Sequence, residues 1–223
     1  MSLRLLLLGV SLAAGLLGVG AAAIPADAAT PLKPSGFSAR VDNPWFPLKP
    51  GSSYVYRGMK EGHVARDTLM VSHSTEKVDG VTCVVVDHRL YLDGRLSDHS
   101  YQWYAQDVTG NVWDFGETGS FKAGIDGAKP GIYMPADPQV GEVGQQEFYK
   151  GQAEDHFQVL SVHASIKVPY TSSHQALLIK EWSPLEPGLV DQKLYIRGIG
   201  TVLERNASGS SERLELVSHR RGF

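Results

Sequence analysis

The chain has 223 residues, with 21 lysines and arginines against 24 aspartates and glutamates, so its formal net charge at pH 7 is −3. This mildly acidic balance without long charge runs lacks the electrostatic footprint of a protein that binds nucleic acid or an anionic membrane. The length fits one domain with a sizeable core, and the single cysteine, Cys83, excludes an intramolecular disulfide.

Residues 1–28 have the pattern of a cleaved signal peptide. Arg4 supplies the positive start, Leu5 to Leu17 an apolar run, and Ala26-Asp27-Ala28 an A-x-A cleavage site. A membrane anchor is the weaker alternative, because glycines dilute the run and no stop-transfer charges follow it. We therefore expect an exported, periplasmic or secreted protein with no membrane span after cleavage. A flexible segment 29–36 should follow, then a single β domain over 37–217 and a C-terminal tail over 218–223.

Short runs rich in valine, tyrosine and threonine recur between turn signals, which predicts an all-β, antiparallel meander. The expected strands are 53–59, 64–73, 81–92, 95–107, 112–116, 145–150, 154–168, 174–182, 190–197, 200–206 and 211–217. Glu61-Gly62, Asp79-Gly80 and Asp93-Gly94 are turn dipeptides, the last a strong hairpin signal. Cys83 lies in a valine-rich strand and should be a buried thiol.

A two-residue hairpin at Asp93-Gly94 predicts a definite strand register. Leu92 would lie opposite Arg95, Arg89 opposite Asp98, and His88 opposite His99. Two cross-strand imidazoles are close enough to share a metal ion. A zinc site needs three or four ligands, however, and the sequence places no third one. His88 and His99 are therefore weak metal candidates, and no resident metal or cofactor is expected.

The stretch WYAQDVTGNVWDFGE, residues 103–117, surrounds a Gly110-Asn111 turn with aromatic and acidic side chains. A two-residue loop would set Asp107 opposite Asp114, a like-charge contact that destabilises unless a cation or a proton lies between them. A three-residue loop removes this clash and sets Asp107 opposite Trp113. The favoured interpretation is a structural hairpin in which Asp107 serves the turn. In the register of the two-residue loop, Tyr104, Val108, Trp113 and Phe115 would share one face, as core residues do.

The other face of the Asp93-Gly94 hairpin should carry Asp87 and Gln102, pointing the same way as Tyr91 and Tyr104. A few polar groups among aromatic rings suit a pocket that orients an otherwise apolar guest. The predicted ligand-binding residues are Asp87, Gln102, Trp103, Tyr104 and Trp113. The alternative is that this face is simply solvated.

Residues 119–144 hold six glycines and three prolines, too long a stretch for an ordinary connection. We expect a packed loop that crosses one end of the sheet. Acidic residues in and after this loop could form a calcium site, although no EF-hand spacing supports one. They are Asp126, Asp137, Glu142, Glu147, Glu154 and Asp155.

Two blocks of sequence resemble an uncharacterised family of bacterial exported proteins. They are VDNPWFPLKPG at 41–51 and YIRGIGTV at 195–202, and the WYAQD, GNVW and FGE groups between them resemble a subfamily signature. The resemblance implies an antiparallel sheet curled into an open or closed barrel, similar to the half-barrels of outer-membrane lipoprotein carriers. It implies no reaction.

The chain carries no nucleophile, metalloprotease, phosphate-loop or dinucleotide motif. The leading hypothesis is a non-enzymatic barrel or half-barrel that binds an apolar or amphipathic small molecule, a lipid or a protein partner. The first alternative is a small-molecule hydrolase or isomerase, with Asp107, Asp114 and Glu117 as its acid–base residues. The second is a structural envelope protein or a calcium-binding module.

Cleavage after Ala28 should leave an exported protein that begins near Ala29 and dissolves without detergent, because it removes the one long apolar run. Intact-mass measurement on the exported protein checks this. A mass that retains residues 1–28 would contradict the prediction.

Overall fold

The computed structural model describes residues 33–222, and this range is almost entirely β-sheet. It begins with one turn of 3-10 helix, η1 (Pro34–Gly36). None of the helical segments in this range has the length and apolarity that a bilayer-spanning helix requires. The strands are β1 (Phe37–Ser38), β2 (Ser53–Lys60), β3 (His63–Val78), β4 (Val81–Leu92), β5 (Arg95–Asp107), β6 (Val112–Glu117), β7 (Phe121–Lys122), β8 (Lys129–Met134), β9 (Val143–Gln145), β10 (Glu147–Phe148), β11 (His156–Lys167), β12 (Ser172–Trp182), β13 (Asp191–Ile196), β14 (Gly200–Asn206) and β15 (Arg213–Arg220).

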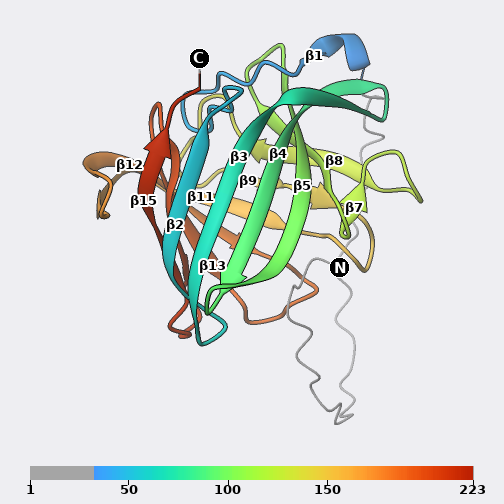
Figure 1. The fold of residues 1–223 in the computed structure, drawn as a ribbon. Helices are drawn as coiled ribbons and strands as arrows, with labels where there is room; N and C mark the ends of the chain where they lie inside the picture. The colour runs from blue at the N-terminus through green and yellow to red at the C-terminus, as the bar shows by residue number, and fades with distance from the viewer. Residues whose placement is uncertain (1–32, 223) are drawn as a thin grey trace, which may run out of the picture.

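The strands form one antiparallel sheet that curls into a nearly closed barrel (Figure 1). Two meanders, β2 to β6 and β11 to β15, are joined where β15 pairs with β2. The order along the sheet is β10-β8-β6-β5-β4-β3-β2-β15-β14-β13-β12-β11-β9, and outside this path β1 pairs with β5 and β7 with β6. This arrangement confirms the predicted all-β barrel.

The segment 143–148 brings the two edges of the sheet together. Its first half, β9, pairs with β11, and its second half, β10, pairs with β8 at the other edge. Gly131 in β8 makes the close approach possible, because a Cβ atom there would lie 2.3 Å from the backbone oxygen of Gln145. Closure of this kind hides edges that would otherwise offer unpaired backbone groups.

The three predicted hairpin turns are confirmed. Glu61, Asp79 and Asp93 each have positive φ and are followed by a glycine that also has positive φ. Two successive residues in this conformation match the twist of a tight hairpin, and they explain why each dipeptide ends in glycine.

The predicted register beyond Asp93-Gly94 is wrong, because β5 carries a bulge. Leu92 does lie opposite Arg95, but the pairing shifts between Leu90 and Tyr91, so that Leu90 faces Asp98. Arg89 consequently faces His99, and His88 faces Ser100. A slip of one residue moves side chains to the other face of a sheet. His88 and His99 therefore do not form a pair.

The turn after β5 is longer than either predicted loop. The last paired residues are Gln106 and Val112, and Tyr104, not Asp107, lies opposite Asp114. Asp107 instead accepts hydrogen bonds from the backbone N–H of Thr109 (2.8 Å), the backbone N–H of Asn111 (3.0 Å) and the indole N–H of Trp113 (2.8 Å). The proposed like-charge contact does not exist, and the prediction that Asp107 serves the turn is confirmed.

Several predicted boundaries differ from the structure. The segment 119–144 contains β7 and β8, and Pro130 and Gly131 hid the latter strand from sequence patterns. The predicted tail from 218 is strand as far as Arg220, where it pairs with Ser53. In the segment 29–36, Pro34–Gly36 form η1, while residues 29–32 and the predicted signal peptide lie outside the described residues.

Two apolar clusters occupy opposite faces of β4, β5 and β6. Val84, Val86 and Tyr104 belong to the interior cluster of the barrel. The outer cluster contains Cys83, Trp103, Ala105 and Phe115, with Trp113 packed against it. Tyr104 is therefore on the opposite face from Trp113 and Phe115. Val108 is 85% exposed in the turn, so the predicted common core face is wrong.

Residues 41–48, which we call the plug, cover one end of the barrel. Trp45, Phe46 and Leu48 are buried. Asn43 fixes the plug: its side-chain amide donates to the backbone oxygens of Gly110 and Pro135, both at 3.0 Å. Its side-chain oxygen accepts from the backbone N–H of Trp45 at 2.8 Å. One buried amide thus ties the plug to two loops.

Replacement of Asn43 by alanine should lower the free energy of unfolding by roughly 1–3 kcal/mol, the usual loss when buried hydrogen-bond partners are left unpaired. Urea unfolding measures this. Asp42→Ala is the matched control, since the Asp42 side chain is 49% exposed, and its ion pair with Arg40 and the hydrogen bond that it accepts from Gln106 are surface contacts. Equal losses in the two variants would show that Asn43 does not hold the plug.

Candidate ligand-binding cavity

The barrel encloses a cavity of about 260 Å³ between the plug and the strands. Phe46, Pro47 and Leu48 of the plug form an apolar part of its wall, together with Leu69 and Val71 of β3. The hydroxyl of Tyr54 donates to the backbone oxygen of Pro47 at 3.1 Å, which anchors this wall to β2. The plug therefore closes the cavity as well as the barrel end.

Most of the charged side chains in the rest of the wall are acidic. Only two lysines, Lys60 and Lys193, face eight carboxylates, with His88 as a further basic group. The carboxylates are Asp67, Asp98, Asp114, Glu117, Glu147, Asp155, Glu181 and Glu204. Buried charge is costly unless it is paired or hydrogen-bonded, so the distribution of partners decides what this wall can bind.

Lys193 holds one group of acids. Its Nζ atom lies 2.7 Å from Oε2 of Glu181 and 4.0 Å from Oε2 of Glu204. Burial lowers the pKa of Lys193. The negative charge of Glu181, followed by the charges of the other groups around Lys193, has the larger effect, so the net pKa is well above its usual value. Lys193 is therefore a cation at neutral pH, and it compensates the two glutamates.

Asp191 lies at the edge of the same group. It accepts a hydrogen bond from the side-chain amide of Asn206 at 3.1 Å. Burial, followed by the charge of Glu204, raises the pKa of Asp191 to about 6. This carboxylate is therefore a source of electrostatic strain at neutral pH.

His88 is the centre of a second polar network. Its Nε2 atom lies 2.7 Å from Oδ1 of Asp67, and its Nδ1 atom lies 3.4 Å from the hydroxyl of Ser100. Ser100 donates to Oε1 of Glu117 at 2.5 Å, and Gln102 donates to the same oxygen at 3.4 Å. Burial lowers the pKa of His88, but the hydrogen bond and charge of Asp67 raise it more, so the net shift is upward.

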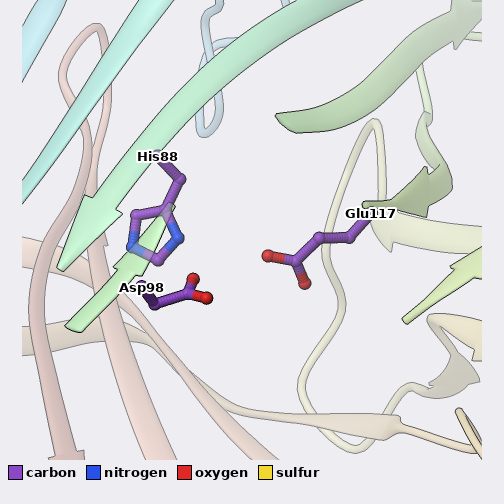
Figure 2. A group of neighbouring side chains, drawn as sticks. All are labelled: His88, Asp98 and Glu117. Atoms are coloured by element: carbon purple, nitrogen blue, oxygen red, sulfur yellow. The ribbon is translucent and has the colours of Figure 1, made fainter. Parts of the chain in front are cut away.

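His88, Asp98 and Glu117 also satisfy a distance condition for metal binding. One potential ligand atom from each lies within 4.8 Å of the others. Figure 2 shows the three side chains converging from β4, β5 and the end of β6. Among residues 33–222, the acidic residues proposed for calcium form no such group.

Tyrosines complete the polar wall. Burial raises the pKa of Tyr104 and Tyr56 well above the usual value, and that of Tyr133 to about 12. Their hydroxyls therefore keep their protons. Tyr104 donates to the side-chain oxygen of Gln102 at 3.2 Å, and Tyr56 to the backbone oxygen of Thr201 at 2.9 Å.

The structure separates the predicted ligand-binding residues. Gln102 and Tyr104 line the cavity. Asp87 lies on the outer face, where it contacts Arg89 at 3.0 Å and His99 at 3.2 Å. Trp103 and Trp113 belong to the outer cluster. The prediction that Asp87 and Gln102 point the same way is wrong, because the bulge makes Val86, not Val85, the partner of Gln102 and so puts Asp87 on the opposite face.

The predicted acid–base residues do not form one group. Asp114 and Glu117 line the cavity, whereas Asp107 belongs to the turn. Cys83 is buried, as predicted, and burial raises its pKa to about 12, which makes a reactive thiolate unfavourable.

Sequence reasoning missed Asp67, Asp98 and the Lys193 group. A signal for Asp67 was present, since it alternates with Ala65, Leu69 and Val71 on a face that is otherwise apolar. A carboxylate that interrupts such an inward-facing row indicates a polar interior.

No protein-family model and no curated protein matches the chain. Among solved structures, it is similar to a protein from Parabacteroides distasonis ATCC 8503 that is described as a candidate lipoprotein, with 12% identity and a TM-score of 0.40 over 78% of this chain and 97% of that one. A likeness this weak carries no argument about function. The resemblance to bacterial exported proteins stays a prediction.

Asp191→Asn should change how stability depends on pH. A carboxyl group whose pKa is higher in the folded than in the unfolded chain binds more protons when folded. The unfolding free energy therefore falls as pH rises from about 4 to about 6. The asparagine variant lacks this loss, so it should gain stability relative to the wild type between these values, as measured by urea unfolding.

Asp107→Asn provides a control of opposite sign. Burial raises the pKa of Asp107, but hydrogen bonds from Thr109, Trp113 and Asn111 lower it more, so its ionised form stabilises the fold. That variant should lose stability relative to the wild type as pH rises toward about 4, the ordinary pKa of an aspartate. A pH-independent difference between the wild type and Asp191→Asn would contradict the assignment for Asp191.

Proposed function

We propose that the barrel binds a small amphipathic molecule with a positively charged head group, such as an amine, inside its cavity. The observation that carries this proposal is the composition of the wall, in which eight carboxylates and two lysines lie in the same enclosure as an apolar surface. The predicted class of ligand, an apolar or amphipathic molecule, is thereby narrowed to an amphipathic molecule with a positive charge.

The distribution of charged side chains in the wall supports a cationic head group on the ligand. Lys193 is close to Glu181 and Glu204, and Lys60 lies 3.8 Å from Glu204, so both lysines serve one side of the wall. Near His88, no lysine of residues 33–222 lies within ion-pair distance of Asp67, Asp98 or Glu117. In a partly buried site, a ligand cation interacts more strongly with such groups than it would in water.

The apolar part of the wall and the size of the cavity support a small apolar portion of the ligand. Phe46 and Leu48 on the plug, with Val71 and Val86 on the strands, offer a surface on which a short hydrocarbon chain or ring would be removed from water. The volume of about 260 Å³ is near the lower end of ligand pockets, which span roughly 300–1,000 Å³. The ligand should therefore be small, not a full-length phospholipid.

The location of this binding activity remains a separate proposal. Export rests on residues 1–28, which lie outside the described residues. Binding in the cavity does not require export, and the two can be tested separately.

A matched series of hexylamine, hexanol and hexanoate tests the proposal. We expect hexylamine to raise the melting temperature most at neutral pH, hexanol less and hexanoate not at all, because only a ligand of the native state stabilises it. Isothermal titration calorimetry in the presence of a chelator should give the same order and excludes a contribution from metal ions.

Two valines on β4 provide the matched variants. Val86 lines the cavity, whereas Val85 packs against the outer cluster. Val86→Phe should fill the cavity and abolish hexylamine binding, while Val85→Phe should leave it unchanged, with folding of both checked by circular dichroism. If no member of the series binds the wild type, the proposal fails and a structural envelope role is favoured. Preferential binding of hexanoate would also overturn it.

A further inference from the structure

We propose that His88, Asp98 and Glu117 form a binding site for one divalent transition-metal ion, of the Zn²⁺ class, in the wall of the cavity. The inference goes beyond the proposed binding of an amphipathic cation and does not depend on it. It starts from the convergence of an imidazole and two carboxylates from three neighbouring strands (Figure 2). Imidazole and carboxylate are both common ligands of this ion.

The orientation of His88 is the second observation. Its Nε2 atom is held at 2.7 Å from Oδ1 of Asp67, which is not one of the three potential ligands. A neutral imidazole whose proton is on Nε2, beside Asp67, carries its lone pair on Nδ1. Metal-ligating histidines typically have their other N–H directed at a carboxylate or carbonyl, which fixes both the tautomer and the ring orientation, and Asp67 is the carboxylate next to Nε2 here.

The Nδ1 atom lies on the side of the ring where Glu117 approaches. Nδ1 and Oε1 of Glu117 share one neighbour, the Ser100 hydroxyl, at 3.4 Å and 2.5 Å respectively. Gln102 also donates to Oε1 of Glu117, at 3.4 Å. The hydrogen bonds from Ser100 and Gln102 to Oε1 hold the glutamate near the imidazole, so that the site is partly organised before an ion binds.

The ligand atoms must move closer together when the ion binds. Metal–ligand distances of about 2.0–2.1 Å in a tetrahedral site place neighbouring ligand atoms about 3.3 Å apart, compared with a spread of up to 4.8 Å here. Rotation about the side-chain bonds of Glu117 and Asp98 supplies this movement without a change in the strands.

Three protein ligands leave at least one coordination position open. Because all three residues line the cavity, the open position faces its interior and would hold water or a polar atom of a ligand. Such an open arrangement differs from a structural zinc site, in which four protein ligands close the coordination shell. The assigned role is therefore ion binding in the cavity, not stabilisation of the fold.

Titration of the purified full chain with ZnCl₂ in a non-chelating buffer, followed by calorimetry, tests the site. We expect one equivalent of Zn²⁺ to bind, and Co²⁺ in its place to show visible absorption bands of a nitrogen–oxygen site. Asp98→Asn and Glu117→Gln should each weaken Zn²⁺ binding at least about tenfold. Asp67→Asn, which removes the orienting carboxylate, should weaken it about 10–100-fold and alter the Co²⁺ bands.

The outer face supplies matched controls. Asp87→Asn and His99→Gln change the same residue types on the same two strands, but their side chains contact each other outside the cavity. Both should bind Zn²⁺ like the wild type, and circular dichroism should show that all variants are folded. The proposal is overturned if the wild type binds no stoichiometric ion, or if the cavity variants bind as the controls do. Failure of the hexylamine series would leave this result unaffected.

Discussion

Backbone pairing across the segment 143–148 is the interaction on which the rest of the structure depends. An antiparallel sheet has two edges, and an unpaired edge exposes a row of backbone donors and acceptors. Here β9 pairs with β11 and β10 with β8, so one short segment serves both edges. Closure creates a barrel interior. A side chain such as Asp67 can therefore be shielded from bulk water although it lies on a regular strand.

The interior does not have the composition of a core selected only for stability. Val86, Leu177 and Leu203 pack it in the ordinary way, yet Lys193 and Glu181 are placed among them at an energetic cost. Replacing paired buried charges by apolar residues is often neutral or stabilising, so their presence is weak support for a stability role. A cavity bordered by ionisable groups is more readily understood as a recognition surface, which is why the function proposed here depends on the wall and not on the barrel fold.

Sequence reasoning predicted the fold well and the candidate site poorly, for one physical reason. Local signals such as Asp93-Gly94 and the alternation of apolar residues determine most strands and turns, and most of these were predicted correctly. Strand β8 and the length of the turn after β5 are exceptions. The face to which a side chain points depends on register, and a single extra residue in β5, between Leu96 and Asp98, shifted the register by one residue. Gln102 and Tyr104 were assigned to the pocket correctly, whereas Asp87 was assigned to the wrong face. Contacts such as His88–Asp67 join separate strands and leave no local signal.

The pairing of β15 with β2 has a kinetic consequence. Ser53 lies opposite Arg220, so strands near the two ends of the described chain are neighbours in the sheet. Closing so long a chain loop is entropically costly and slows folding. A nascent or truncated chain that lacks residues 213–220 would leave β2 and β14 as open edges, which are templates for intermolecular pairing. The barrel is therefore most exposed to aggregation in the interval before its last strand is available.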